Sequence, residues 1–377
     1  MATGPFLLLY AALYGGYGAL SPFLPAFLET RGLGASEIGT LLAAAMLARL
    51  AAGPILGRLA DRQGAVRGFL AVGLVLAAGL TLALLGGLGF SVLLALTLGH
   101  AVATAPLAPL ADAAALAGGR DGAVYGRIRA AGSAAFIATT ILTGFLVGPF
   151  GHGIGLLLCA GLFGAAALAT LRLPAPAGPD LRSTHRDRGG FGSLIADPRF
   201  RRLVLAAALV IGAHAMHDAF AVLLWQGAGI GPRAAGLLWA EAVAAEVAVF
   251  LWLGPRLVAR LGPPRALALA ALAGTLRWAV QAQTVWLPAL AAIQALHGIT
   301  FALLHLACLR LIVEAVPEAR RATALSLYGT FGLGFASALM TLVSGPLNEA
   351  LGMKAFWIMA LVSLSAVPVA RSLARPR

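Results

Sequence analysis

Long apolar stretches run through almost the whole of this chain and leave few folds open to it. Of its 377 residues, 60% are hydrophobic and 11% are charged, whereas a soluble domain carries about 25% charged residues. A helix of about 20 residues crosses the ~30 Å hydrocarbon layer of a bilayer, so apolar stretches of that length predict membrane-spanning helices. The sequence therefore predicts an all-α membrane protein and excludes a soluble globular domain.

Twelve stretches of sufficient length are separated by connectors, most of which contain glycine or proline. They cover residues 6–28, 36–57, 67–88, 91–116, 123–148, 152–172, 201–226, 234–255, 265–283, 285–313, 321–345 and 351–372. The one long polar connector, from Pro174 to Arg202, divides them six and six. We therefore expect a six-helix bundle over 1–172, a linker over 173–200 and a second six-helix bundle over 201–377.

Arginines alternate between these connectors. The connectors after even-numbered stretches hold most of them, and the others hold little beyond Arg31, Arg233 and Lys354. Cytoplasmic loops are enriched in Lys and Arg, so we expect the even-numbered connectors, the linker and both termini to be cytoplasmic. The arginines of these cytoplasmic connectors then account for the net charge of +13. Nucleic acid is therefore not an expected partner.

The few ionisable residues within the apolar stretches indicate where function lies. A charge in the centre of a bilayer costs at least about 2.5 kcal/mol, so such residues usually face a cavity and mark an ion or substrate path. In the first half they are chiefly Arg49 and Asp112. In the second half they are His214, His217, Asp218, Glu241, Glu246, Arg277, His297 and His305.

The tenth stretch carries the clearest polar pattern. At 100° per residue one narrow face collects Gln294, His297, Phe301, His305 and Cys308. Such a face should meet a cavity or a neighbouring helix. Both histidines are candidates for substrate binding, and the alternative is that they only form hydrogen bonds between helices.

The eighth stretch places Glu246 near mid-depth, on the face of Trp239 and Phe250, and turns Glu241 the opposite way. Desolvation disfavours a charged carboxylate, so Glu246 is the candidate proton carrier. The alternative is a permanent ion pair between Glu246 and Arg277.

Asp218, Glu241 and Arg277 lie at a similar depth from the outer ends of their helices, by the rise of 1.5 Å per residue. We therefore expect Arg277 to pair with Asp218 or Glu241. All three residues are candidates for proton coupling together with Glu246.

The seventh stretch puts His214, Asp218 and Trp225 on one face, with His217 beside them. The spacing His-x-x-His-Asp can hold a metal, but no further ligands accompany it. A polar lining of a substrate cavity is the favoured interpretation, and no metal is expected.

In the first half, Tyr10, Tyr14, Tyr17 and Ser21 share one face of the first stretch. This face is either an aromatic cavity wall, with Tyr14 and Tyr17 contacting substrate, or an interfacial anchor. Arg49 is the candidate ligand for a carboxylate, which a guanidinium binds through two hydrogen bonds. Its alternative is a pair with an acid of the second half, Glu246 or Asp218.

Two further groups suggest gating elements. Asp112 ends the fourth stretch, and Arg127 and Arg129 open the fifth; they form either an ion-pair gate or simple charge compensation at helix ends. Between the second and third stretches, Gly57-Arg58-Leu59-Ala60-Asp61-Arg62-Gln63-Gly64-Ala65-Val66-Arg67 resembles the signature loop of the major facilitator superfamily. The alternative for its Asp61 and Arg62 is a basic loop that sets topology only.

Several segments together resemble the phenylpropionate permease family, which is related to the lactose permease group. They are Pro109-Leu110-Ala111-Asp112-Ala113, YGRIRAAGSAAFI from Tyr125, Gly212-Ala213-His214, Trp225-Gln226, LLWAEAVAAEVAVF from Leu237, Arg277-Trp278 and QALHGITFALLHLACLRLI from Gln294. The resemblance implies the major facilitator fold and a proton symporter for small organic acids, monomeric, in a bacterial-type inner membrane. The chain departs from this family at His217, Asp218 and Glu241, which we expect to set what it carries.

Together these features predict proton-coupled symport of a small organic solute, in particular an organic or aromatic acid, by alternating access. The proton gradient would drive it without a cofactor. The alternatives are proton-driven efflux of drug-like or sugar-like solutes, and a membrane receptor that does not transport. An enzyme is not expected, because HExxH, GxSxG and any nucleophile beside a base are absent from the sequence.

Overall fold

The computed structural model describes residues 3–116, 122–174 and 190–374, and every regular element in these ranges is a helix. Most of the predicted linker 173–200 lies outside the described residues. The chain divides into two compact units, the first comprising 1–183 with 229–240 and the second 184–228 with 241–377. Each unit is described by itself.

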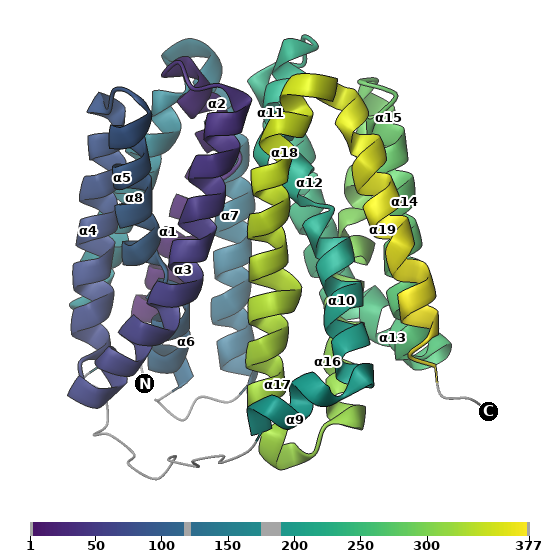
Figure 1. The fold of residues 1–377 in the computed structure, drawn as a ribbon. Coiled ribbons are helices and arrows are strands. Elements are labelled where there is room, and N and C mark those ends of the chain that lie inside the picture. Colours follow the sequence, from purple (N-terminus) through teal and green to yellow (C-terminus); the bar gives the residue numbers. More distant parts are fainter. Residues whose placement is uncertain (1–2, 117–121, 175–189, 375–377) are drawn as a thin grey trace. The chain divides into compact units, whose positions relative to one another are not determined.

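The first unit contains eight of the described helices (Figure 1). They are α1 (Gly4–Leu20), α2 (Leu24–Thr30), α3 (Ala35–Gln63), α4 (Val66–Gly86), α5 (Phe90–Thr104), α6 (Leu107–Leu116), α7 (Gly122–Phe150) and α8 (Gly153–Thr170). Gly64 caps the end of α3, and its φ of +61° is left-handed, a conformation that glycine adopts without steric cost. The segment 57–67, which resembles the signature loop, therefore comprises the end of α3, a tight turn and the first residues of α4.

Close packing in the first unit depends on glycines of α1. A Cβ atom on Gly18 would lie 2.4 Å from the carbonyl oxygen of Phe136 in α7, and one on Gly16 would lie 2.5 Å from the ring of Phe163 in α8. Small residues let helix backbones approach closely in a membrane, where lipid gives no hydrophobic drive for helices to associate. The tyrosines of α1 are therefore held firmly against α7 and α8.

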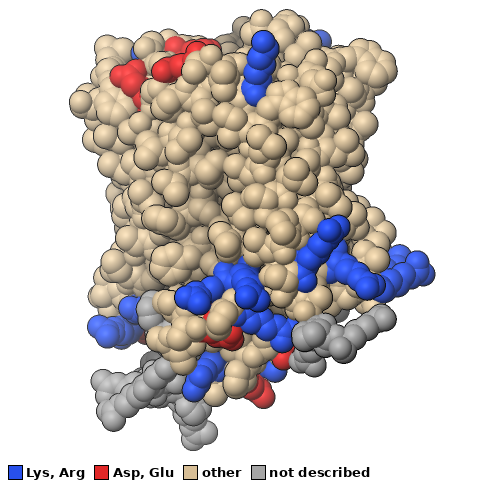
Figure 2. Space-filling model, turned by 45° about the vertical axis from the view of Figure 1, so that its right-hand side comes forward, with Lys and Arg blue, Asp and Glu red and all other residues tan. Residues whose placement is uncertain are grey.

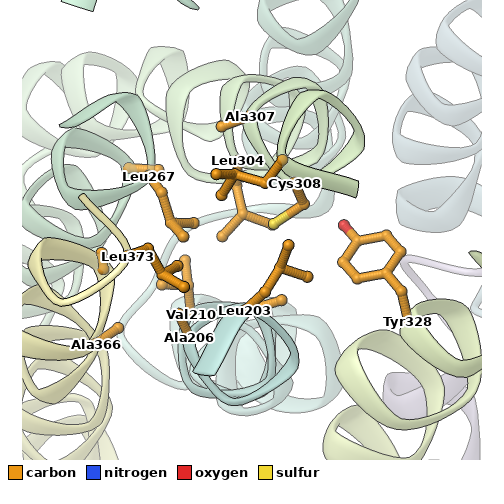
Figure 3. Packing of buried hydrophobic residues seen from close by; sticks show 14 of the residues in the cluster. Leu203, Ala206, Val210, Leu267, Leu304, Ala307, Cys308, Tyr328, Ala366 and Leu373 are labelled. Carbon is orange, nitrogen blue, oxygen red and sulfur yellow. The ribbon is translucent and has the colours of Figure 1, made fainter. Parts of the chain in front are cut away.

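The second unit contains the remaining helices. They are α9 (Gly190–Ala196), α10 (Pro198–Gly212), α11 (Ala215–Gly227), the end of α12 (Pro232–Ala248), α13 (Gly254–Leu261), α14 (Pro263–Gln281), α15 (Leu287–Ala295), α16 (Leu304–Ala315), α17 (Arg321–Leu327), α18 (Ala336–Leu351) and α19 (Phe356–Arg371), with short 3-10 turns at Glu318–Arg320 and Gly352–Ala355. The helix α14 packs along α19, and α10 packs against α18 and α19. Figure 3 shows part of the buried core, where Leu203, Ala206 and Val210 of α10 face Leu267 and Leu304.

Three π-helical segments interrupt the helices of the second unit: Val249–Leu253 (η1), Ile299–Leu303 (η2) and Tyr328–Phe335 (η4). A π-helical turn inserts an extra residue and is frequent at functional sites. Within the described residues, each of the three segments lies beside an ionisable or phenolic side chain singled out below.

The structure is that of a membrane protein. Nine helical stretches of the described residues are long and apolar enough to cross a bilayer, or ten when α1 and α2, bent by 45° at their junction, count as one. Large apolar side chains stay exposed along them, among them Val75, Phe150, Leu168 and Leu361. The count of twelve stays a prediction.

Candidate functional site

Arg277 of α14 is the centre of a polar network inside the second unit. Its side chain is fully buried. One terminal nitrogen, Nη2, donates to Gln294 Oε1 at 2.7 Å, and the other, Nη1, donates to His297 Nδ1 at 2.9 Å and to Thr300 Oγ1 at 3.5 Å. All three partners lie on the continuous stretch from α15 into η2, so one arginine joins two helices through uncharged groups.

The contact with Arg277 fixes the tautomer of His297. A guanidinium only donates hydrogen bonds, so His297 Nδ1 must accept, and the ring proton must be on Nε2. That nitrogen lies 3.4 Å from Glu246 Oε2 of α12. The neutral imidazole therefore connects the buried cation to the carboxylate. Its Nδ1 accepts a hydrogen bond from Arg277, and its Nε2–H faces Glu246.

Gly298 brings these two helices together. A Cβ atom at this position would lie 2.4 Å from the carbonyl oxygen of Ala245 and 2.7 Å from the side chain of Val249. The backbone of the tenth predicted span thus passes directly over that of the eighth, next to His297 on one side and Glu246 on the other. Glycine is required here by this close approach.

His214 has the opposite tautomer. Its Nδ1 lies 2.9 Å from the carbonyl oxygen of Val210, which can only accept, so Nδ1 carries the proton. Its Nε2 then accepts from the Thr300 hydroxyl at 2.9 Å. The ring of Trp278 meets His214 edge-on at a centroid distance of 5.1 Å. Thr300, which our sequence analysis did not single out, thus ties His214 to Arg277; a lone threonine in an apolar run gives no signal of such a role.

The expected pairing of Arg277 with Asp218 or Glu241 is wrong. Asp218 contacts His217 instead, at 3.2 Å between Oδ1 and Nδ1, and its side chain is 49% exposed. Glu241 takes part in none of the ion pairs among the described residues. The Arg277 side chain points toward α15 and η2, because buried hydrogen-bond acceptors lie there. The depth of a residue along its helix does not determine toward which neighbouring helix its side chain points. The alternative of a direct Glu246–Arg277 pair is also wrong, since His297 stands between them.

His305 of α16 lies in a second polar contact. Its Nδ1 is 3.0 Å from the hydroxyl of Tyr328, which is buried at the start of η4. The ring of Phe250 meets it edge-on at 6.1 Å, and Glu246 interacts with it electrostatically. Tyr328 was missed by our sequence analysis, although it is a polar aromatic residue that opens the glycine-rich run YGTFGLGF.

Aromatic rings enclose His217 next to the Arg277 network. Its ring centroid lies 5.6 Å from those of Trp225 and Trp278. Trp225 is fully buried. His217 therefore connects the exposed Asp218 carboxylate to the apolar interior of the unit.

In the first unit, Asp112 of α6 joins three other residues. Tyr10 donates to Asp112 Oδ1 at 2.5 Å, and Arg129 Nη1 lies 3.3 Å from the same oxygen and donates to the Tyr14 hydroxyl at 2.5 Å. Arg127 is exposed and is absent from the ion pairs of the described residues. The structure thus brings Asp112 and Arg129 together, as expected, and adds two tyrosines that sequence spacing had placed only on a common face.

The remaining candidates of the first unit are more exposed. The rings of Tyr14 and Tyr17 meet edge-on at 6.0 Å, and Arg49 of α3 is exposed. Asp61 and Arg62 are exposed at the end of α3. Their gating role stays a prediction. Within the described ranges, no three His, Cys, Asp or Glu side chains gather as metal ligands would.

An all-helical membrane protein with buried arginine and histidine side chains joined across helices to partly exposed carboxylates has the construction of a transporter. Residues 5–359 match the MFS_1 like family. The chain belongs to this family, and with it to the major facilitator superfamily of transporters. It is accordingly a transporter and not an enzyme, as expected.

Two relatives are similar along nearly the whole chain. A probable 3-phenylpropionic acid transporter of Escherichia coli (strain K12) is 32% identical over 362 residues, covering 95% of this chain and 94% of the relative. A maltose permease of Geobacillus stearothermophilus is 32% identical over 352 residues, covering 91% and 87%. The crystal structure of nucleoside transporter NupG superposes with a TM-score of 0.87 at 17% identity, over 100% of this chain and 99% of that one, which shows a shared fold.

Proposed function

We propose that this protein is a proton-coupled symporter that takes up a small organic acid by alternating access. The observation that carries the proposal is the 3.4 Å contact between Glu246 and His297. Because Arg277 holds His297 neutral, the carboxylate faces a dipole and no direct cation. A carboxylate removed from water without a paired charge is costly, and a proton is the counter-ion that neutralises it. Glu246 would thus bind the proton that crosses with the substrate, and no cofactor is needed.

The proposal includes twelve spans in two six-helix halves. The nine candidate spans become ten with the bent pair α1 and α2. The run Glu318–Arg371 has 54 residues, about 81 Å at 1.5 Å per residue, which is enough for two crossings. The helix α14, with 19 residues, covers the ninth predicted span. The ten spans, the second crossing within Glu318–Arg371 and α14 together make twelve.

We propose that the arginine-rich ends of the helices, both termini and the linker face the cytoplasm of a bacterial-type inner membrane. In Figure 2 most Lys and Arg side chains on the visible face gather toward its lower end. An excess of Lys and Arg is typical of cytoplasmic loops. The protein would work as a monomer, with protons, the solute and the bilayer as its partners.

For the substrate, we propose that Arg49 holds an anionic group. It is exposed in the interior of α3 and belongs to none of the ion pairs of the described residues. A guanidinium without a partner suits a carboxylate, which it can bind bidentately. The relative described as a probable 3-phenylpropionic acid transporter supports an aromatic acid. Tyr14 and Tyr17, on the same unit as Arg49, are the proposed residues that contact the substrate beside it. In the second unit the proposed substrate residues are His214, Trp225 and His297.

The test is transport in proteoliposomes with labelled 3-phenylpropionate. In Glu246→Gln, uptake driven by an inward proton gradient should be lost while counterflow of preloaded substrate at equal pH persists. Glu318→Gln, which changes an exposed carboxylate at the end of a helix, is the matched control and should behave as wild type. Gradient-driven uptake that survives in Glu246→Gln rules out the proton assignment.

A sugar-like neutral solute is the second candidate, because the maltose permease is also 32% identical to this chain. Counterflow of labelled 3-phenylpropionate against unlabelled maltose, nucleosides and aromatic acids separates the two. Everted and right-side-out vesicles would distinguish efflux from uptake. Binding of a solute without any flux would indicate a receptor.

A further inference from the structure

Arg277 carries a buried positive charge that no carboxylate contacts. Its side chain is fully buried, and its two terminal nitrogens donate to Gln294, His297 and Thr300, which are uncharged. None of the ion pairs among the described residues includes it. Its third nitrogen, Nε, has no acceptor in the described part of the chain. A buried cation is costly unless an opposite charge compensates it, so this arrangement lacks one component.

Two buried indole groups beside Arg277 also lack an acceptor. The side chains of Trp225 and Trp278 are fully buried, and their Nε1–H groups meet no acceptor within the described ranges. The guanidinium carbon of Arg277 lies 4.4 Å from the centroid of the Trp278 ring. The His217 ring centroid lies 5.6 Å from those of both indoles. A buried indole N–H usually has a partner, so this cluster holds three donors that need an acceptor.

Gln281 extends the cluster by one helical turn. It follows Trp278 by three positions and Arg277 by four in α14, so the three residues share one face of the helix. Its side chain is fully buried, and neither Nε2 nor Oε1 has a partner among the residues that the structure describes. Most buried polar side-chain groups are hydrogen-bonded, and each exception requires an explanation. Packing alone does not explain a glutamine here, because methionine would fill a similar space without burying an amide.

We propose that the unpaired groups around Arg277 form an anion-binding site inside the second unit. The residues of the site are Arg277, Trp225, Trp278 and Gln281. A guanidinium and an indole nitrogen only donate hydrogen bonds, so they suit a ligand that accepts several of them and carries a negative charge. Such a ligand is a halide ion or a carboxylate group. Water could accept the same hydrogen bonds, but it would leave the charge of Arg277 uncompensated.

The carboxylates of this region do not replace such an anion. Glu246 and Asp218 reach the cluster only through histidine rings, with contacts of 3.4 Å to His297 and 3.2 Å to His217. The Asp218 side chain is also 49% exposed, so solvent screens its charge. An anion in contact with the guanidinium would compensate Arg277 directly.

The proposed anion site is separate from Arg49, because all four of its residues belong to the second unit. It also goes beyond the proposed proton coupling and does not depend on it. The anion has two possible sources, free chloride and the carboxylate of a solute. Both present the same chemistry to the site, and the experiment distinguishes them.

The experiment measures the thermal unfolding midpoint of the purified protein in detergent while sodium chloride replaces sodium sulfate at constant ionic strength. A ligand that binds only the folded state raises this midpoint. We expect a saturable rise of about 2 °C or more. The same titration is repeated with sodium 3-phenylpropionate. A rise with chloride assigns the site to a halide, and a rise with the acid alone assigns it to the carboxylate of a solute.

Gln281→Met is the decisive variant, because methionine keeps the size of the side chain and removes both unpaired polar atoms. Without an added anion its unfolding midpoint should equal or exceed that of wild type, since no unpaired amide is buried. The half-saturating anion concentration should rise at least about tenfold, as expected for the loss of one hydrogen bond to a charged group. Trp225→Phe removes one indole N–H and should weaken binding in the same way.

Two exposed residues near the end of α14 provide matched controls. Gln283→Met and Trp286→Phe make the same chemical changes at exposed positions, and both variants should respond to the anion as wild type does. The absence of a saturable rise in wild type with either anion would overturn the site. An undiminished rise in both Gln281→Met and Trp225→Phe would also overturn it, because the anion would then bind elsewhere. If Gln281→Met does not fold, the result for Trp225→Phe decides. Proton-driven uptake plays no part in these measurements, so Glu246→Gln tests the proposed function separately.

Discussion

The guanidinium of Arg277 donates to His297 Nδ1 at 2.9 Å, and the opposite nitrogen of the same ring lies 3.4 Å from Glu246 Oε2. A fully buried cation is therefore connected to a carboxylate through one neutral imidazole. Any change in the charge of Glu246 alters the hydrogen bond that His297 makes to it, and through the ring it affects Arg277. This linkage explains why three residues from three helices must keep one geometry.

Replacing Arg277 by methionine should destabilise the protein more than a typical surface change. Gln294 Oε1 and His297 Nδ1 would both lose their donor, and each buried acceptor left unsatisfied costs about 1–3 kcal/mol. The expected result is a clear fall in the thermal unfolding midpoint in detergent. Arg233→Met, an exposed arginine outside this network, is the control. Equal unfolding midpoints for the two variants would show that the hydrogen bonds of Arg277 do not stabilise the protein.

Gly298→Ala should separate the helices that carry His297 and Glu246. The added methyl group would lie 2.4 Å from the carbonyl oxygen of Ala245, and overpacking of this kind typically costs about 1–3 kcal/mol. We expect a lower unfolding midpoint and loss of gradient-driven uptake. Gly161→Ala, where a methyl group meets nothing within 4 Å, should leave both unchanged. A fully active Gly298→Ala would show that the close approach is not needed.

The sequence predicted the helical class, the positions of the long helices and the group Gln294–His297, because these follow from local composition and helical periodicity. It did not predict the partner of Arg277. That pairing depends on the rotation of α14 against the stretch from α15 to η2, which the periodicity within each helix does not reveal. In the structure Gly274 of α14 packs closely on Ser363 of α19, and Gly298 packs on Ala245 and Val249. The π-helical segment η2 also changes the direction of side chains beyond it, so a uniform 100° per residue does not describe His305.

Tyr10→Phe and Tyr14→Phe should both destabilise the first unit, the former by leaving Asp112 with fewer donors. A hydrogen bond to a charged group contributes about 1.5–3 kcal/mol. Tyr10 is completely buried while Arg129 is 44% exposed, so water can replace the Tyr14 contact more easily. The fall in unfolding midpoint should therefore be larger for Tyr10→Phe. The reverse order would mean that Arg129, not Tyr10, is the main support of Asp112.

Thr300→Val tests whether the hydroxyl that joins His214 to Arg277 matters for more than packing. Valine keeps the shape but removes the donor to His214 Nε2 and the acceptor for Arg277. Because Nδ1 of His214 stays bound to the carbonyl of Val210, its Nε2 would be left as a buried unpaired acceptor, which costs about 1–3 kcal/mol. Thr300→Ser keeps the hydroxyl and loses only a methyl group. We expect Thr300→Ser to retain most of the stability and uptake that Thr300→Val loses, measured by thermal unfolding and by gradient-driven uptake; equal losses in both variants would assign the role of Thr300 to packing.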